Sequence, residues 1–237
     1  ATPEDYFLWD NDGTTIIGLN EEKLSRVTKI RIPSKCKVIR SDFYSSSLTE
    51  DYRNLIKQMI TIEIPDTVTE IGSYAFYEFN NVEKINIPNS VTSIGDSAFY
   101  RCSSLTSITI PGSVASIGKE AFWDCSGLTS ITMSKGVTNI GERAFCDCSS
   151  LTSITIPDGV TSIGEGAFGD CFSLTSITIP DSVTSIGKNE AFWRCRSLTN
   201  VTYNGTKEQW NKIGKDSNWN YNSAIKTITC TDGVIML

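Results

Sequence analysis

The sequence predicts an α/β-type repeat solenoid, a right-handed superhelix of 23-residue coils with a parallel β-sheet on its concave side. The first observation is an apolar residue that opens the same strand-like phrase in every coil. It stands at Met59, Val82, Leu105, Leu128, Leu151, Leu174 and Leu198, in steps of 23 residues with a last step of 24. The extra residue lies within positions 188–190, which predicts an outward loop there.

The second observation is that a single coil cannot bury its own apolar side chains. In one coil the inward residues are Leu105, Ile108, Ile110, Val114, Ile117, Ala121, Phe122 and Cys125. Stacked coils can bury them, because each side chain lies on its equivalent in the next coil. With strands about 4.8 Å apart, the expected row of about eight strands gives a sheet roughly 34 Å long.

The first half of each coil predicts a short strand and a turn. Ile108 and Ile110 alternate with Thr109, which is the period of a strand with one buried face. Pro111 has no N–H and ends the ladder, and a Pro-Gly-Ser turn follows it.

The second half of each coil predicts another extended piece and a corner. Val114 and Ile117 point inward from this piece. Gly118 is expected to turn the corner with a positive φ, which glycine tolerates best. The Ala-Phe-x-x-Cys segment that ends at Cys125 is expected to form one turn of α- or 3₁₀-helix with Ala121, Phe122 and Cys125 inward.

The N-terminal flank, residues 1–26, predicts a cap hairpin. Two apolar runs at 6–9 and 14–17 surround Asp10-Asn11-Asp12-Gly13, a turn signal. The repeat region is expected to span 27–203, and its first strand lies at 27–33. An inserted helix is expected at about 48–58, where Ser47 and Glu50 form a capping-box pair.

The C-terminal flank, residues 204–237, predicts a second cap. Thr206 and Gln209 form another capping-box pair, so a short helix at 207–213 should lay Trp210 and Ile213 over the last coil. Residues 224–237 then predict a hairpin that turns at Asp232-Gly233. We expect one capped domain without a long internal linker, and because it begins at Ala1 rather than Met, a processed or shortened product.

Composition narrows the classes of function. The formal charge of −6 and pI near 4.8 argue against nucleic acid as a partner, since phosphate binding favours a basic face. No run approaches the roughly 18 apolar residues of a membrane span. Histidine is absent, which removes the usual general base and the commonest zinc ligand. We expect a monomer that is not an enzyme, with no cofactor, no metal and no membrane insertion.

The eight cysteines allow a disulfide framework, a metal array, reactive thiols or simple packing. Five of them form one column: Cys102, Cys125, Cys148, Cys171 and Cys195. Parallel side chains at neighbouring levels make a disulfide awkward, and an odd column cannot pair fully within itself. Phe79 occupies the same column one coil earlier, which a packing column accepts and a metal array does not. We therefore expect reduced, buried thiols in this column, and a partly exposed free thiol at Cys146.

The phrase L-x-x-I-x-I-P-x-x-V-x-x-I-G-x-x-A-F-x-x-C, which covers about residues 59–203, resembles the leucine-rich repeats of the BspA or Treponema pallidum type. The resemblance implies a secreted or cell-surface bacterial protein. It would bind a protein or glycan on a host or neighbouring cell, in the manner of an adhesin. The alternative is a structural spacer or scaffold domain of a larger cell-surface protein.

Two outward faces are candidates. Serine and threonine columns cover the sheet, and one end of it is charged, at Lys29, Arg31, Glu63 and Lys84. An aromatic column after the Ala-Phe pair carries Tyr77, Tyr100, Trp123, Cys146, Gly169 and Trp193, either as binding anchors or lying flat over the next coil. The charged column beside it is expected to be solvated: Glu78, Arg101, Asp124, Asp147, Asp170 and Arg194.

Overall fold

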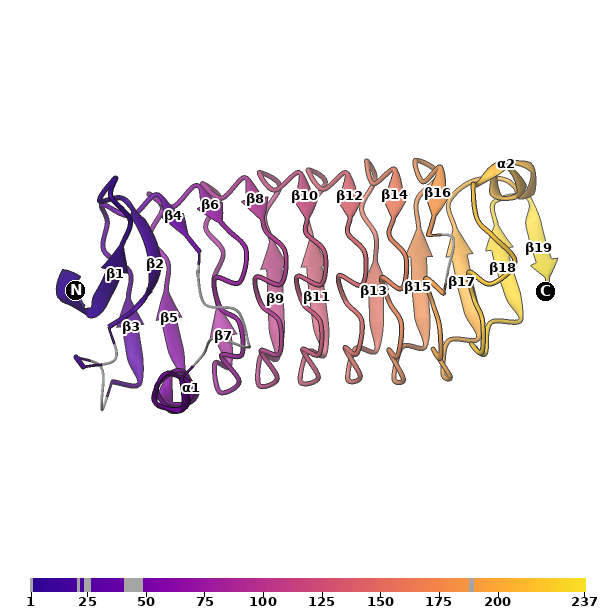
Figure 1. The fold of residues 1–237 in the computed structure, drawn as a ribbon. Helices are drawn as coiled ribbons and strands as arrows, with labels where there is room; N and C mark the ends of the chain where they lie inside the picture. The colour runs from indigo at the N-terminus through magenta and orange to yellow at the C-terminus, as the bar shows by residue number, and fades with distance from the viewer. Residues whose placement is uncertain (1, 21, 24–26, 41–48, 188–189) are drawn as a thin grey trace.

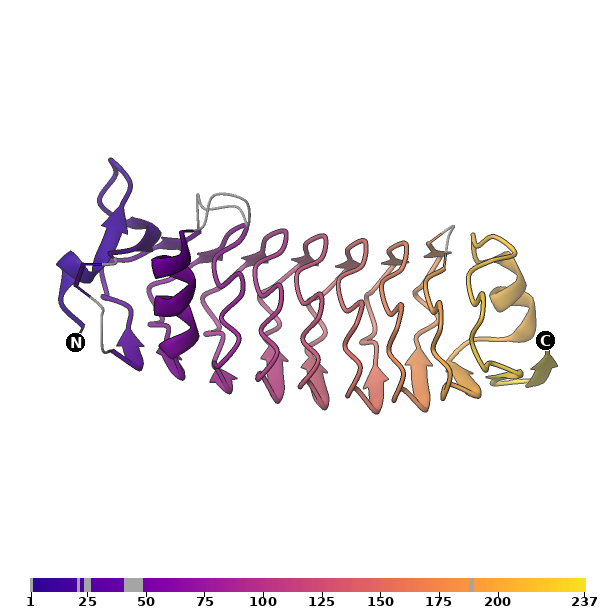
Figure 2. The same ribbon diagram turned by 60° about the horizontal axis from the view of Figure 1, so that its bottom comes forward.

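Successive coils lie side by side in an elongated molecule, with the N-terminus at one end and the C-terminus at the other (Figure 1). The computed structural model describes residues 2–237 except 21, 24–26, 41–48 and 188–189. The expected loop of extra length at 188–190 therefore falls largely outside the described residues. Each coil contributes strands to two separate parallel sheets (Figures 1 and 2). The predicted solenoid is confirmed.

The strand phrase forms a row that is divided into two five-stranded sheets. The first contains β3 (Lys29–Arg31), β5 (Thr61–Glu63), β7 (Lys84–Ile85), β9 (Ser107–Ile110) and β11 (Ser130–Met133). The second contains β13 (Ser153–Thr155), β15 (Ser176–Ile179), β17 (Asn200–Tyr203), β18 (Thr227–Cys230) and β19 (Gly233–Met236). Equivalent residues pair between coils, as Ile131 does with Ile108. Within the described chain, no backbone hydrogen bond joins β11 to β13.

The second extended piece of each coil forms a continuous nine-stranded sheet. Its strands are β1 (Phe7–Trp9), β2 (Thr15–Leu19), β4 (Val38–Ile39), β6 (Glu70–Ile71), β8 (Ser93–Ile94), β10 (Ser116–Ile117), β12 (Asn139–Ile140), β14 (Ser162–Ile163) and β16 (Ser185–Ile186). β1 pairs antiparallel with β2, which confirms the N-terminal hairpin. β2 then pairs parallel with β4, so the hairpin extends the sheet.

The glycine after each strand of this second sheet is required by close stacking, and the positive φ expected at Gly118 is wrong. Gly118 is not among the described residues with positive φ. A Cβ there would lie 2.5 Å from the carbonyl carbon of Gly95, and a Cβ at Gly141 would lie 2.6 Å from that of Gly118. The backbones of successive coils therefore approach too closely for any side chain.

The Ala-Phe-x-x-Cys segment is a series of turns, so the expected helical turn is also wrong. Tyr100 N–H donates to the Ser97 carbonyl and Cys102 N–H to the Phe99 carbonyl, both at 3.2 Å, as in a 3₁₀ turn. However, Ser97 and Arg101 have φ values of 52° and 57°, which a right-handed helix cannot include. Alternate N–H groups donate instead to the next coil: Ser97 to Lys119, Phe99 to Ala121 and Arg101 to Trp123.

The core consists of columns of identical or similar apolar side chains. The phenylalanine column runs through Phe76, Phe99, Phe122, Phe145, Phe168 and Phe192, with neighbouring ring centroids 4.9 to 5.6 Å apart. Its rings are inclined to one another by 5° to 25°, an offset stack. Trp219 ends the stack edge-on, 5.8 Å from Phe192.

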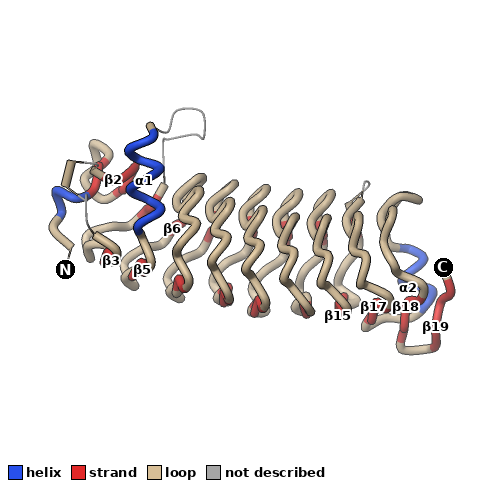
Figure 3. Tube along the Cα trace, turned by 90° about the horizontal axis from the view of Figure 1, so that it is seen from below, coloured by secondary structure: helices blue, strands red, loops and turns tan. Residues whose placement is uncertain are grey.

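The inserted helix lies near the N-terminal end of the molecule (Figure 3). It is α1 (Glu50–Gln58), preceded far upstream by a single 3₁₀ turn, η1 (Glu4–Tyr6). The predicted start at 48 is two residues early. Thr49 is the N-cap, and its hydroxyl accepts a hydrogen bond from Tyr52 N–H at 3.0 Å. Ser47, the predicted capping residue, lies outside the described residues.

The C-terminal elements agree with the prediction. The second helix is α2 (Lys207–Lys212), and Thr206 and Gln209 form its capping box. Trp210 and Ile213 are buried. β18 and β19 form the predicted hairpin, in which Cys230 pairs with Gly233.

Candidate functional site

The outer face of the strand-phrase sheets carries the predicted serine and threonine columns. Ser107, Thr109, Ser130 and Thr132 are exposed on β9 and β11, while the isoleucines between them are buried. A groove of about 490 Å³ opens between β11 and β13, where the ladder of hydrogen bonds is interrupted. Its lining includes Lys135 and Asp158, which form an exposed ion pair at 3.3 Å, and Asn204. The sequence columns did not single out these three residues.

The charged end of this face is brought together by strand pairing. Lys29 and Arg31 on β3 both bind the Glu63 carboxylate on β5. These two cations lower the pKa of Glu63 to about 2. Lys84 follows on β7, in register with Thr61. Lys29, Arg31 and Lys84 are exposed and Glu63 is partly exposed, so the four predicted residues form one accessible patch.

The aromatic column is partly exposed and partly packed against itself. The Tyr77 and Tyr100 rings stack at 4.8 Å and 10°, and Trp123 meets Tyr100 edge-on at 5.4 Å. Trp193 stands apart, two coils beyond Cys146. Tyr77, Tyr100 and Trp123 therefore pack on one another, and all four rings of the column remain partly exposed.

A hollow interrupts the aromatic column where Cys146 and Gly169 replace large rings. It has a volume of about 210 Å³, with Trp123 and Trp193 on its two sides. Its other lining residues are Arg143, Cys146, Asp147, Glu165, Gly166, Gly169, Asp170 and Glu190. Guanidinium groups lie over both indoles, Arg143 at 5.7 Å from the Trp123 ring centre and Arg194 at 5.0 Å from that of Trp193.

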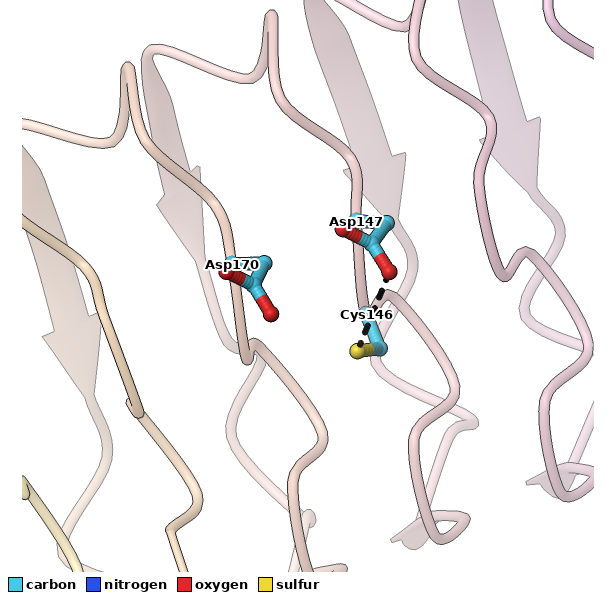
Figure 4. A group of neighbouring side chains, drawn as sticks. All are labelled: Cys146, Asp147 and Asp170. Atoms are coloured by element: carbon cyan, nitrogen blue, oxygen red, sulfur yellow. Dashed lines mark hydrogen bonds between the residues drawn. The ribbon is translucent and has the colours of Figure 1, made fainter.

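Cys146 lies at the base of this hollow and is buried, so its predicted partial exposure is wrong. The next coil lies close to its side chain, since a Cβ at Gly169 would be 3.4 Å from the Cys146 sulfur. The thiol points toward Asp170, and one oxygen of Asp147 lies beside it (Figure 4). Burial, followed by the charges of Asp147 and Asp170, raises the pKa of Cys146 to about 12.

The charged column is not wholly solvated as expected, because Glu78 and Asp170 are buried. Arg53 and Arg101 both pair with Glu78, at 3.1 and 3.4 Å, and Arg101 pairs with Asp124 in turn. Asp170 is only 5% exposed and lies 2.9 Å from Arg194. Burial raises the pKa of Asp170, and the charge of Asp147 adds to this effect.

The column of five cysteines forms a buried ladder. All eight cysteines lie in the described part of the chain as free, buried thiols. Each ladder thiol donates to a phenylalanine carbonyl of the preceding coil, as Cys125 does to Phe99 at 3.1 Å and Cys148 to Phe122 at 3.3 Å. Burial raises the pKa of every ladder thiol, in Cys195 to about 12. The geometry therefore supports packing over reactive thiols.

Sequence reasoning placed the columns but missed the hollow as a unit. Gly169 leaves space above Cys146, and stacking brings Asp170 of the next coil beside Asp147. A comparison of adjacent coils would have shown the hollow, because two successive coils replace the aromatic ring with Cys146 and Gly169 beside Asp147 and Asp170. No helix among the described residues has the length and apolar character that crossing a membrane requires.

Comparisons with known proteins agree on the fold. A leucine-rich cell surface protein from Faecalibacterium prausnitzii is 28% identical, with a TM-score of 0.57, over 81% of this chain and 64% of that protein. The chain thus spans less than two thirds of that protein. A leucine-rich repeat protein from Bacteroides ovatus is 24% identical, with a TM-score of 0.61, over 95% of this chain and 69% of that one.

No curated protein was found to match. The model of the BspA-type leucine-rich repeat region matches residues 52–148 and 115–237, in 6 copies. These matches cover well over half of the sequence and include every strand from β5 onward and the aromatic and charged columns after the Ala-Phe pair. The chain therefore belongs to the BspA-type leucine-rich repeat family.

Proposed function

We propose that this protein is a non-enzymatic, surface-presented or secreted repeat protein that binds a protein or glycan on a host or neighbouring cell. The observation that carries the proposal is the partly exposed aromatic column of Tyr77, Tyr100, Trp123 and Trp193. Partly exposed aromatic residues are the commonest anchors of binding interfaces. Cell-surface presentation is supported by the description of the similar Faecalibacterium prausnitzii protein.

The charged patch of Lys29, Arg31, Glu63 and Lys84 is proposed as a second contact area. It lies near the N-terminal end of the sheet, and β3, β5 and β7 hold its side chains on one face. Such exposed charges steer a partner of complementary charge and set the rate of association more than the affinity. A non-enzymatic role is supported by the absence of histidine and by the apolar interior.

The test is a binding screen against extracellular matrix proteins and glycans with two variants. One combines Trp123→Ala with Trp193→Ala, and the other combines Lys29→Gln, Arg31→Gln and Lys84→Gln. We expect the tryptophan variant to weaken binding at least tenfold, since anchor residues cost about 2 kcal/mol or more when truncated. The lysine and arginine variant should reduce the association rate, most strongly at low salt.

Matched controls separate a lost contact from a damaged fold. Tyr221→Ala removes an exposed aromatic outside the column, and Lys212→Gln removes an exposed charge at the other end of the molecule. Both should bind as the unaltered protein does. Binding that neither test variant weakens contradicts the proposed surfaces. Binding to nothing in a broad panel favours the alternative, a spacer or scaffold domain of a larger surface protein.

A further inference from the structure

We propose that Cys146, Asp147 and Asp170 form a binding site for one thiophilic divalent cation of the zinc type. The thiol sulfur and one oxygen of each carboxylate all lie within 4.8 Å of one another. Cys146 Sγ and Asp147 Oδ2 are 3.8 Å apart. Zinc–sulfur bonds of about 2.3 Å and zinc–oxygen bonds of about 2.0 Å require ligand atoms roughly 3.5 Å apart. Binding therefore requires the three ligand atoms to approach one another further.

A buried carboxylate oxygen that receives no hydrogen bond is the second observation behind this site. Asp170 is more than nine-tenths buried and lines the hollow. Its Oδ1 is enclosed and receives no hydrogen bond from the described residues. Nη1 of Arg194 lies 2.9 Å from this oxygen as an ion-pair partner, without a hydrogen bond between them. The ion pair offsets part of the cost of burying this oxygen, and the missing hydrogen bond leaves it a site that a cation can occupy.

The surroundings orient the two carboxylates as neighbours of a metal site do. Trp123 Nε1–H donates to Asp147 Oδ2 at 2.8 Å, and Arg194 pairs with Asp170. Such partners fix ligating carboxylates and strengthen metal binding. A thiolate and two carboxylates carry three negative charges, which a divalent cation and the Arg194 guanidinium together balance. The thiol proton passes to solvent as the metal–sulfur bond forms.

The ligand set and the space select the kind of cation. A thiolate is a soft ligand, which favours zinc, cadmium or cobalt over magnesium and calcium. Calcium also requires six to eight oxygen ligands. The cavity of about 210 Å³ above Cys146 leaves room for a water molecule as the fourth ligand. The neighbouring coils lack this combination, because Trp123 and Gly169 occupy the position of the thiol.

The test titrates the reduced, metal-stripped protein with Co²⁺ and then with Zn²⁺. We expect one Co²⁺ per chain, a thiolate-to-cobalt charge-transfer band, and displacement of Co²⁺ by Zn²⁺. Cys146→Ser should abolish the band and lower zinc affinity roughly tenfold or more, and Asp170→Asn should lower it similarly. Cys230→Ser, which removes a buried thiol at the far end of the chain, should leave both unchanged.

The absence of a charge-transfer band in the unaltered protein would overturn the site. So would a band that persists in Cys146→Ser, or a band that Cys230→Ser loses as fully as Cys146→Ser does. Thermal unfolding of each metal-free variant shows whether it folds. If Cys146→Ser does not fold, the site is tested instead by alkylating the cysteines of the unaltered protein with and without zinc. Zinc should slow modification of Cys146, mapped by mass spectrometry, but not that of Cys230. Equal rates at Cys146 with and without zinc contradict the proposal.

Discussion

The repeated cysteine fits its place in the coil through both size and hydrogen bonding. Each ladder thiol is fully buried and donates to a phenylalanine carbonyl of the preceding coil. That carbonyl also accepts the N–H of the cysteine in its own coil, as Phe99 accepts from Cys102 at 3.2 Å. A small apolar side chain with one weak donor therefore suits the position, whereas alanine would leave space and no donor.

The ladder thiols should be inert until the protein unfolds. Burial raises the pKa of these thiols, so they stay protonated at pH values at which an ordinary cysteine is ionised. Only the ionised thiolate reacts with disulfide reagents. We expect a thiol titration at mildly alkaline pH to leave Cys102, Cys125, Cys148, Cys171 and Cys195 unmodified in the folded protein. All eight cysteines should react in denaturant. Rapid modification of ladder cysteines in the folded protein would contradict the packing role.

At the scale of the strand and its neighbours, backbone contact between coils allows only glycine at the corner that follows each strand of the nine-stranded sheet from β8 to β16. The corner glycines have ordinary φ values, yet a Cβ at Gly141 or Gly164 would fall 2.5 to 2.6 Å from the backbone of the coil before it. The turn glycine Gly112 differs, since its Cβ would lie 3.5 Å from the Ser134 side chain and 4.0 Å from the Gly136 nitrogen, which are ordinary contact distances. Replacement by alanine should therefore change the free energy of unfolding at a corner glycine but not at the turn glycine.

Gly141→Ala should lower the free energy of unfolding by about 1–3 kcal/mol or more, because overpacking forces two coil backbones apart. Gly112→Ala is the matched control, and should change it by less than about 0.5 kcal/mol. Urea denaturation followed by circular dichroism measures both. Equal effects of the two substitutions would show that close stacking is not the reason for the corner glycine.

The contact between β3 and β5 should depend on pH through Glu63. Its pKa falls from 4.5 to about 2 in the folded state, first through hydrogen bonds from Lys29 and Arg31. A depressed carboxyl pKa adds stability above the unfolded value, and this contribution disappears as pH falls from about 4.5 to 2. Glu63→Gln should therefore lower the melting temperature slightly at pH 7 and not at pH 2. If Glu63→Gln lowers the melting temperature by the same amount at both pH values, this ion pair is not the cause.

At the scale of the whole molecule, stability requires that both open ends of the stack be covered. The N-terminal hairpin continues one sheet through β2 and β4. At the other end, Trp219 closes the phenylalanine column and packs edge-on against Trp210 at 5.5 Å. Trp210 in turn contacts Tyr203, the last inward residue of β17, at 5.2 Å. The C-terminal cap thus covers the core with an aromatic cluster.

Trp219→Ala should lower the free energy of unfolding by about 3–5 kcal/mol, as for other buried tryptophans. Tyr221→Ala, two residues away and 57% exposed, should have an effect below about 0.5 kcal/mol. Denaturant unfolding measures the free energy of unfolding of both variants. Hydrogen exchange should show faster opening in the last coil of Trp219→Ala than in the central coils, because each coil contacts only its neighbours. Uniform acceleration along the chain would contradict a capping role.

The sequence predicted most of the fold because the repeat is a one-dimensional pattern. Inward positions such as Ile108, Phe122 and Cys125 are set by periodicity and by burial, which depend only on spacing. The capping box at Thr206 was also predictable, since its two residues are local. Trp219 was not, because it lies in a segment without periodicity and acts only by contacting Phe192 across the chain.

The candidate surfaces were predictable as columns but not as sites. Lys29, Arg31 and Glu63 could be placed on one face from strand register alone. The burial of Cys146 and Asp170 could not be predicted, because it depends on how far the side chains of adjacent coils cover each other.

The sequence by itself determined the coil, its length, its inward residues and its caps, since these follow from spacing and local hydrogen bonding. Only the tertiary structure decided three further features: the steric reason for Gly118, the turns with positive φ at Ser97 and Arg101, and the hollow that joins Cys146, Asp147 and Asp170. All three depend on distances between neighbouring coils. Such distances are set by the packing of side chains and backbones in space, which a one-dimensional pattern does not contain.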